Sequence, residues 1–374
     1  MNSTQTTYLH LVRTALWGEK SSSPLPSFTS SSFPSLLRLC AEQGTGPLVF
    51  PLLLEQEEIP AALHRQMMGT CVQTMQSQVQ LQHTLNVAWT ALTNAGVRPV
   101  LMKGAGLAAL YPEPQHRPWG DVDLFVGKDQ YHPACEVMRN TFPDALKFDE
   151  ELDHYKHYNL IADGISIEIH RVTIGLQHPL DERRFARMER RGMERAETIE
   201  TGGITLRIPE PTFNALFVFF HSWEHMMTSG ANIRQLCDLA LLLHHYAGRL
   251  DQAYLLQSLK ALKLLDVWQL YMYILVQYMG LPVEQALFYT TSVAGRADRL
   301  VTDLLEGRMR ENMHIAGTPS APRSRVSRKF STMKQRMANA ARVGQYSPDY
   351  ARHLRWTTWL HGARRFFAKD RHWE

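Results

Sequence analysis

An Asp163-Gly164 pair lies between two stretches of alternating apolar residues, NLIA and ISIEIH. Both central positions of a type I′ turn need a positive φ, and Asp-Gly is among the pairs that supply it. The pair therefore predicts an antiparallel hairpin whose register is fixed by a two-residue turn. A second hairpin is expected where Gly202-Gly203 separates ETIET from ITLRI.

The other expected elements follow from periodicity and from Pro and Gly positions. Strands are expected at 98–102 and 121–126, and short helices at 104–110 and 130–139. Longer helical patterns cover 60–95 and almost all of 211–313, with basic helices at 327–342 and 349–368. Loops are expected at 21–35 and 314–325, where Pro, Ser and Gly break the pattern.

These patterns predict an α+β protein with a small mixed β-sheet, preceded by N-terminal helices and followed by a C-terminal helical domain. The expected units are an N-terminal helical segment, a sheet-containing core, a helical domain and a basic C-terminal helical tail, at residues 1–95, 96–208, 209–315 and 316–374. A length of 374 residues is consistent with more than one packed unit.

Composition excludes several classes of protein. Hydrophobic residues make up 44% of the chain and charged residues 20%, so wholesale disorder and a collagen-like fibre are excluded. We expect no membrane span and no secretory signal, because no apolar run is long enough and the first residues have no basic segment before an apolar one. The four cysteines are scattered without metal-binding or disulfide spacing, which favours the cytoplasm.

The charge of the chain is unevenly distributed. From Gly317 to Glu374 there are thirteen Lys and Arg against three Asp and Glu, whereas the rest of the chain carries 27 against 33. Such a basic tail indicates either an anionic partner, such as nucleic acid, or a solvated pair of basic helices. A helix packed on the body with its arginines outward fits the pattern as well.

Three acidic residues fall on predicted strands. Because alternate side chains of a strand share a face, Asp121 and Asp123 project together, and Glu168 projects with His170 from a later strand. Two carboxylates on one face repel each other, and a half-buried third one needs a cation or a donor. Mg²⁺ prefers carboxylate oxygens and substrate phosphates, so these acids are candidate ligands of Mg²⁺, with Mn²⁺ as the alternative.

A candidate phosphate site precedes the acids. Lys103-Gly104 lies where a strand gives way to a helix, so exposed backbone N–H groups, the positive helix end and the Lys103 charge meet there. Arg117, shortly before the acids, could hold a phosphate oxygen bidentately. Together the turn, the arginine and the acids predict a site for Mg²⁺ and a nucleoside triphosphate (NTP).

The order of these motifs resembles the polymerase-beta-type nucleotidyltransferase superfamily, and within it a bacterial family of uncharacterised nucleotidyltransferases. The motif-bearing resemblance covers residues 95–175, with a looser helical similarity to about residue 245. It implies that the segment 96–208 is the nucleotidyltransferase core. The sequence departs from the wider superfamily in having Lys103-Gly104 in place of Gly-Ser and Glu168 in place of the more usual Asp.

The resemblance implies roles for individual residues. Asp121 and Asp123 match the paired acids that bind both metal ions, Glu168 matches the third acid on the acceptor side, and Gly104 matches the turn glycine that holds the triphosphate. The implied reaction transfers a nucleoside monophosphate (NMP) from an NTP to an unidentified acceptor, such as a small molecule, sugar or peptide, and releases pyrophosphate. Lys103 and Arg117 would stabilise the phosphates.

Four residues are acceptor-side candidates. His170 shares the strand face of Glu168, and the others belong to helical segments expected to line a cleft beside the core: His221, Arg234 and Asp238. Two other readings of the fold stay open. One is an RNA- or tRNA-modifying or toxin-like transferase that holds RNA with its basic tail, and the other is a catalytically silent binding module.

A zinc peptidase is the alternative from another reaction class. His221, Glu224 and His225 fit the H-x-x-E-H pattern, and on a helix the two histidines lie one turn apart, as zinc ligands would. The pattern lacks an evident third ligand, because Asp238 is expected to pair with Arg234.

Overall fold

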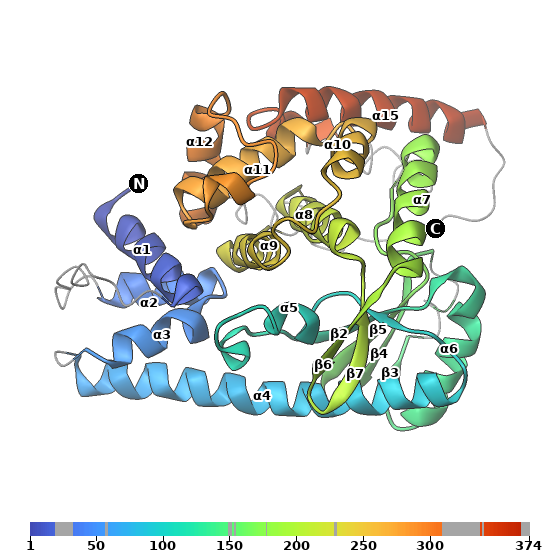
Figure 1. The fold of residues 1–374 in the computed structure, drawn as a ribbon, viewed down its shortest axis with the longest axis horizontal. Helices are drawn as coiled ribbons and strands as arrows, with labels where there is room; N and C mark the ends of the chain where they lie inside the picture. The colour runs from blue at the N-terminus through green and yellow to red at the C-terminus, as the bar shows by residue number, and fades with distance from the viewer. Residues whose placement is uncertain are drawn as a thin grey trace, which may run out of the picture.

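The computed structural model describes residues 1–18, 33–56, 59–148, 152, 155–176, 178–227, 230–308, 337–338 and 340–367. It is a helix-rich α+β protein, in which helices surround a mixed sheet (Figure 1). This confirms the predicted fold class. The loop expected at 314–325 and most of the helix expected at 327–342 lie outside the described residues. So does most of the loop expected at 21–35, although its last three residues begin a helix.

Four helices form the N-terminal part. Their bounds are Ser3–Trp17 for α1, Phe33–Glu42 for α2, Gly46–Leu54 for α3 and Ala61–Asn94 for α4. The long α4 confirms the helix predicted over 60–95, which has no internal proline. It runs from the N-terminal helices to the sheet (Figure 1). Its first half packs through Met67 and Cys71 into one buried core, and its second half packs through Leu85 and Leu92 into another.

The central sheet has five strands in the order β1-β2-β5-β4-β3. Their bounds are Val100–Leu101, Asp121–Phe125, Leu146–Lys147, His157–Ala162 and Ile165–His170 for β1 to β5. The hairpin predicted around Asp163-Gly164 is confirmed as β4 and β5, with Ala162 opposite Ile165. Strands β2 and β5 are parallel neighbours, although a long segment separates them in sequence.

Helices and a second hairpin surround this sheet. Their bounds are Ala105–Ala108 for α5, Pro114–His116 for the 3-10 turn η1, Gly127–Thr141 for α6, Pro179–Glu194 for α7, Glu197–Thr201 for β6 and Ile204–Ile208 for β7. The β6–β7 pair confirms the hairpin predicted at Gly202-Gly203. The helix predicted at 104–110 is only one turn long, and neither β3 nor α7 has a counterpart among the predicted elements.

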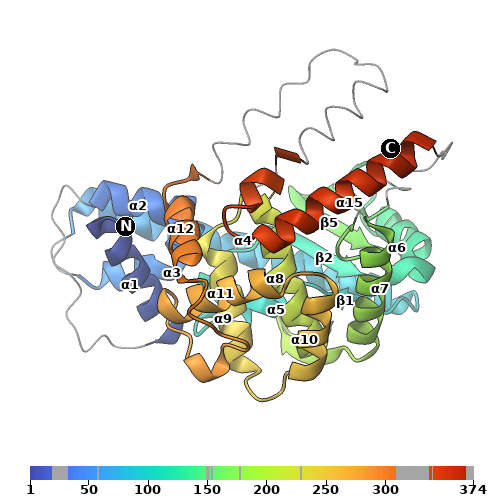
Figure 2. The same ribbon diagram turned by 90° about the horizontal axis from the view of Figure 1, so that it is seen from above.

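The C-terminal part is helical, as predicted. Its elements are α8 Pro211–Met227, α9 Ile233–His245, α10 Gln252–Ala261, α11 Leu265–Gln277, the 3-10 turn η3 Val283–Gln285, α12 Ala294–Leu305 and α15 Pro348–Phe367. Seen from above, α15 crosses the side of the molecule that carries α7 and α11 (Figure 2). His353 on α15 contacts Asp181 on α7, with Nε2 and Oδ2 2.7 Å apart.

Two buried clusters hold the fold together. One joins α1 to α3 with α8 to α12 and contains the largest buried aromatic side chains of α8 and α11. The other lies between the sheet, α4 and α6.

The predicted boundaries near residues 95, 208 and 315 stay predictions. All four cysteines are buried thiols. None of the helices in the described part of the chain combines the length and the apolar character that a membrane crossing requires.

Candidate active site

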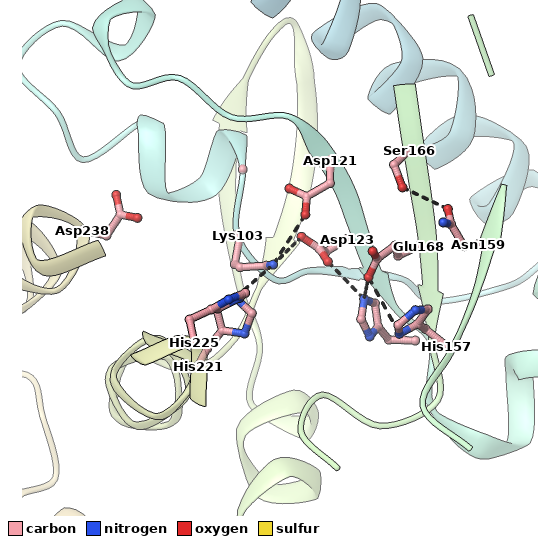
Figure 3. Close-up of polar contacts among 12 residues, drawn as sticks. Lys103, Asp121, Asp123, His157, Asn159, Ser166, Glu168, His221, His225 and Asp238 are labelled. Carbon is pink, nitrogen blue, oxygen red and sulfur yellow. Dashed lines mark hydrogen bonds and ion pairs between the residues drawn. The ribbon is translucent and has the colours of Figure 1, made fainter. Parts of the chain in front are cut away.

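The carboxylate cluster consists of Asp121, Asp123 and Glu168 (Figure 3). Asp121 and Asp123 project from one face of β2, and Glu168 lies directly beside Asp123 in the parallel register of β2 and β5. Each residue offers an oxygen atom, and these atoms lie within 4.8 Å of one another. The strand pairing thus places side by side the three acids that sequence analysis had grouped.

Lys103 is the first cation of this cluster. It follows β1, and its Nζ atom lies 3.0 Å from Oδ2 of Asp123 and 3.8 Å from Oδ2 of Asp121. Burial would lower the pKa of the ammonium, but the two carboxylates raise it above its usual value. Lys103 therefore stays charged inside the protein and neutralises part of the acidic cluster.

His170 is the second cation-forming group. Its Nε2 atom lies 3.1 Å from Oδ1 of Asp123 and 3.1 Å from Oε2 of Glu168. Burial disfavours the imidazolium, but hydrogen bonds to the two carboxylates outweigh it and raise the pKa of His170. The two oxygens of Asp123 thus face different partners, with Lys103 beside one and His170 beside the other.

The carboxylates themselves titrate in opposite directions. Burial would raise the pKa of Asp123, yet Lys103 and His170 hold it well below its usual range. The charge of Asp123 in turn raises the pKa of Asp121, and burial adds to that effect. The Asp121 side chain is 41% exposed, against 2% for Asp123. The cluster is therefore buried and ionised at Asp123. At Asp121 it faces solvent, and the repulsion between the two carboxylates there favours the binding of a further cation.

Gly104 forms the turn after Lys103. Its φ of +53° lies in the region that favours glycine, and a Cβ atom there would come within 2.9 Å of the Trp119 ring. Helix α5 is only one helical turn long, so its dipole is small. The backbone groups at this point are therefore presented by the Lys103-Gly104 turn more than by a helix dipole. The residue type at this position is thus set by backbone conformation and by a close aromatic neighbour.

Arg117 lies under this turn and makes its contacts inside the protein. Its Nε and Nη2 atoms donate to Oδ1 and Oδ2 of Asp238 at 2.6 and 2.9 Å, and Nη1 donates to the Gly104 carbonyl at 3.2 Å. Tyr111 donates a further hydrogen bond to Asp238 at 2.8 Å. Both charged groups are almost fully buried. The phosphate contact expected of Arg117 stays a prediction, and the structure gives this guanidinium a bidentate protein partner.

The acceptor-side candidates are divided between two places. His170 and His221 line a cavity of about 30 Å³ together with Lys103, Asp123 and Glu168. The sequence predicts that Asp238 pairs with Arg234, but its direct partner in the structure is Arg117. Arg234 donates to the Pro118 carbonyl. Figure 3 shows Asp238 apart from the carboxylate cluster, on the other side of Lys103.

Three further residues that the sequence did not indicate as site residues border the carboxylate cluster. Lys156 and Thr173 line the same cavity, and His157 lies opposite His170 across β4 and β5. Lys156 and Thr173 sit just outside the strands, where periodicity carries no signal. The position of His157 follows from the two-residue turn at Asp163-Gly164, because that turn fixes the register of the whole hairpin.

The H-x-x-E-H segment lies on α8, as predicted. The Nε2 atoms of His221 and His225 are 3.0 Å apart, and Lys103 Nζ lies 3.4 Å from Nε2 of His221. Burial, Lys103 and the other histidine lower the pKa of His221 well below its usual value. Among the residues that the structure describes, no group of three metal ligands includes either histidine. The lysine ammonium beside the pair also disfavours a bound cation there.

Comparison with known proteins places the sequence in a family. The sequence model of a family described as "Uncharacterised nucleotidyltransferase" matches residues 29–280, about two thirds of the chain. No curated protein and no solved structure gives a match. The matched segment contains the Lys103-Gly104 turn, the three acids and the α8 and α9 helices beside them. The chain therefore belongs to the uncharacterised nucleotidyltransferase family.

Proposed function

We propose that the protein transfers an NMP group from a Mg²⁺-bound NTP to an acceptor that binds beside Glu168 and His170. The observation that carries this proposal is the gathering of three carboxylates from two adjacent parallel strands, next to a Lys-Gly turn. Cations held near the reacting oxygens stabilise the charge that develops during transfer at a phosphate, and this cluster offers the ligands for them.

The donor set of the cluster fits Mg²⁺. Asp121, Asp123 and Glu168 offer carboxylate oxygens, the ligands that this ion prefers, and the buried Oδ2 of Asp123 has the Lys103 ammonium 3.0 Å away as a stand-in cation. Mn²⁺ prefers the same ligands and is the alternative ion. When bound, the ion would supply positive charge against the charge that develops on the phosphate oxygens.

Lys103 and the Gly104 turn would bind the triphosphate. Lys103 lies between the two aspartates in the structure, and a metal ion at the carboxylates would compete with it for the same oxygens. We propose that its ammonium then turns to the phosphates, as its place at the end of β1 allows. Arg117 would hold the turn in shape through the Gly104 carbonyl.

Glu168 and His170 would face the acceptor. Glu168 would accept the proton of the acceptor hydroxyl, since its side chain is 24% exposed. His170 would fix the orientation of Glu168 and Asp123, because it contacts both. His221 and Lys156, which line the same cavity, would contact the acceptor from the other wall.

The test is a thermal unfolding series with ATP, GTP, CTP and UTP, each with and without Mg²⁺. A nucleotide present at about a hundred times its Kd should add roughly 2.7 kcal/mol to the free energy of unfolding. We expect one or more nucleotides to raise the melting temperature only with Mg²⁺, and expect Asp121→Asn/Asp123→Asn to abolish the effect. Glu136→Gln, at an exposed acid on α6, is the matched control.

The outcomes separate the alternative readings. Mg²⁺-dependent stabilisation that is lost in the double variant but kept in Glu136→Gln supports the transferase. No nucleotide effect in any variant would favour a silent binding module. The preferred NTP is then supplied with a label at its α-phosphate, and the molecule that receives the labelled NMP identifies the acceptor class. Recovery of the label in RNA, together with an affinity for RNA that falls steeply between about 50 and 200 mM salt, would favour an RNA-modifying enzyme.

A further inference from the structure

A second group of potential metal ligands shares Glu168 with the carboxylate cluster. It consists of His157, Glu168 and His170, whose ligand atoms lie within 4.8 Å of one another. Figure 3 shows His157 beside Glu168, on the side away from Lys103 and Asp121. None of the roles proposed above uses His157.

The hairpin register builds this group. His157 on β4 lies directly opposite His170 on β5, and Glu168 precedes His170 by two residues, so all three side chains share one face of the sheet. The centroids of the two imidazole rings are 5.1 Å apart. A rigid hairpin therefore presents two nitrogen ligands and one carboxylate without requiring a loop to order.

The distances suit a first-row metal ion. Oε2 of Glu168 lies 3.1 Å from Nε2 of His170 and 3.8 Å from Nδ1 of His157. Tetrahedral zinc bonds of about 2.0–2.2 Å place neighbouring ligand atoms roughly 3.3–3.6 Å apart. Small side-chain rotations would thus bring all three atoms into one coordination sphere. The adjoining cavity of about 30 Å³ has room for a water-sized fourth ligand.

The donor chemistry differs from that of the three acids. Asp121, Asp123 and Glu168 offer oxygen alone, which suits Mg²⁺, whereas two imidazoles and one carboxylate suit zinc and its neighbours in the first transition series. Affinities of such mixed sites rise from Mn²⁺ towards Cu²⁺ and Zn²⁺. The exposed fractions of the His157 and Glu168 side chains, 22% and 24%, leave a path from solvent.

We infer that His157, Glu168 and His170 form a binding site for a divalent transition-metal ion, for which Zn²⁺ is the natural probe. The site is distinct from the α8 pair of His221 and His225, which has Lys103 beside it and no third ligand among the described residues. It also differs from the proposed Mg²⁺ position, with which it shares one carboxylate. The inference is independent of the proposed transferase activity, because metal binding needs neither nucleotide nor acceptor.

Calorimetric titration of the full chain with Zn²⁺, without nucleotide, tests the site. We expect one ion per chain in the wild type, and a loss of affinity of about 100-fold or more in His157→Gln, since even indirect partners of a metal ligand contribute 10- to 100-fold. His132→Gln, at an exposed histidine on α6, is the matched control and should bind as the wild type does. Circular dichroism melting checks that each variant folds.

Two further variants locate the ion. Asp121→Asn removes a proposed Mg²⁺ ligand and should leave Zn²⁺ binding within a few-fold, so a failed transferase proposal and a failed zinc site give different results. His221→Gln should also bind Zn²⁺. The inference is wrong if the wild type binds no Zn²⁺, if His157→Gln binds as tightly as the wild type, or if the loss of binding appears in His221→Gln or Asp121→Asn instead.

Discussion

Two groups of charged side chains adjoin the Lys103-Gly104 turn, and they differ in how their charges are matched. In the buried Arg117–Asp238 pair, two guanidinium nitrogens meet two carboxylate oxygens, and Tyr111 and the Gly104 carbonyl take the remaining contacts. In the carboxylate cluster, three acids share Lys103 and His170, and one acid is 41% exposed. The first group is satisfied within the protein, whereas the second can bind another cation.

Charged residues that are matched inside the protein and charged residues that are not have different roles. A buried salt bridge whose two charges neutralise each other has no net charge left to attract a ligand, so its effect is on stability and on the shape of the turn. A cluster with repelled carboxylates lowers its energy by binding a cation, and that tendency is what a phosphate-transfer site requires. The following variants test this contrast.

The largest expected effect is on activity and comes from Asp123→Asn. Asp123 contacts both Lys103 and His170 and is the buried centre of the cluster. Loss of this proposed metal ligand would remove several kcal/mol of transition-state stabilisation, and each 1.36 kcal/mol is tenfold in rate. We expect pyrophosphate release with a mixed acceptor pool to fall by about 10³-fold or more. A variant that keeps a tenth of the wild-type rate would contradict the proposed site.

The next largest effect is on stability and comes from the buried pair. Arg117→Met or Asp238→Asn leaves one buried group without its partner, which costs about 3–5 kcal/mol of unfolding free energy. Urea unfolding measures it. The double variant Arg117→Met/Asp238→Leu should cost less than the sum of the two single ones. Additive losses would mean that the two residues do not act as a pair.

Asp121→Asn is the direct counterpart of Asp238→Asn in the carboxylate cluster. Asp123 raises the pKa of Asp121, so the charge of Asp121 opposes folding and its removal should stabilise the protein slightly. Because the side chain is 41% exposed, solvent screening keeps the gain within about 1 kcal/mol. A loss comparable to that of Asp238→Asn would remove the contrast between the two groups.

Gly104→Ala tests the turn that the two groups share. The substitution places a Cβ atom 2.9 Å from the Trp119 ring at a φ of +53°, and we expect a loss of about 1–3 kcal/mol in unfolding free energy. Gly120→Ala is the matched control, since its Cβ would have no atom within 4 Å. Equal melting temperatures for both variants would show that the turn tolerates a side chain.

A separate effect, on the pH dependence of stability, involves His225. Burial, with Lys103 and Lys156 nearby, lowers the pKa of His225 to about 4. The unfolded chain therefore binds more protons, so the stability contribution of neutral His225 is present above pH 6.5 and is lost as pH falls towards 4. We expect His225→Gln to flatten this fall by about 1–2 kcal/mol, after solvent screening of the partly exposed ring. Urea unfolding at pH 7 and pH 4.5 measures the change, and parallel curves would contradict it.

Much of the sheet and of the acidic cluster could be predicted from local sequence. Period-two alternation places Asp121 and Asp123 on one face, and the Asp163-Gly164 turn sets the register of β4 and β5. The same register implies that His157 faces His170, a contact that can be worked out from the printed sequence once the turn is identified. The short α5, the two-residue β3 and the polar α7 were harder, because brief or strongly charged segments carry little hydrophobic periodicity.

Local sequence specified the chemical groups that the chain brings to this site: a Lys-Gly turn, two acids on one strand face and a third on a later strand. Which charges meet follows from tertiary packing alone. Arg117 and Asp238 are 121 residues apart, and nothing local to either predicts their pairing. Their ion pair, and the approach of His221 to Lys103, arise because the α8 and α9 helices pack against the turn and bury it. A charged group is stable in such a buried place only beside a polar partner from the protein.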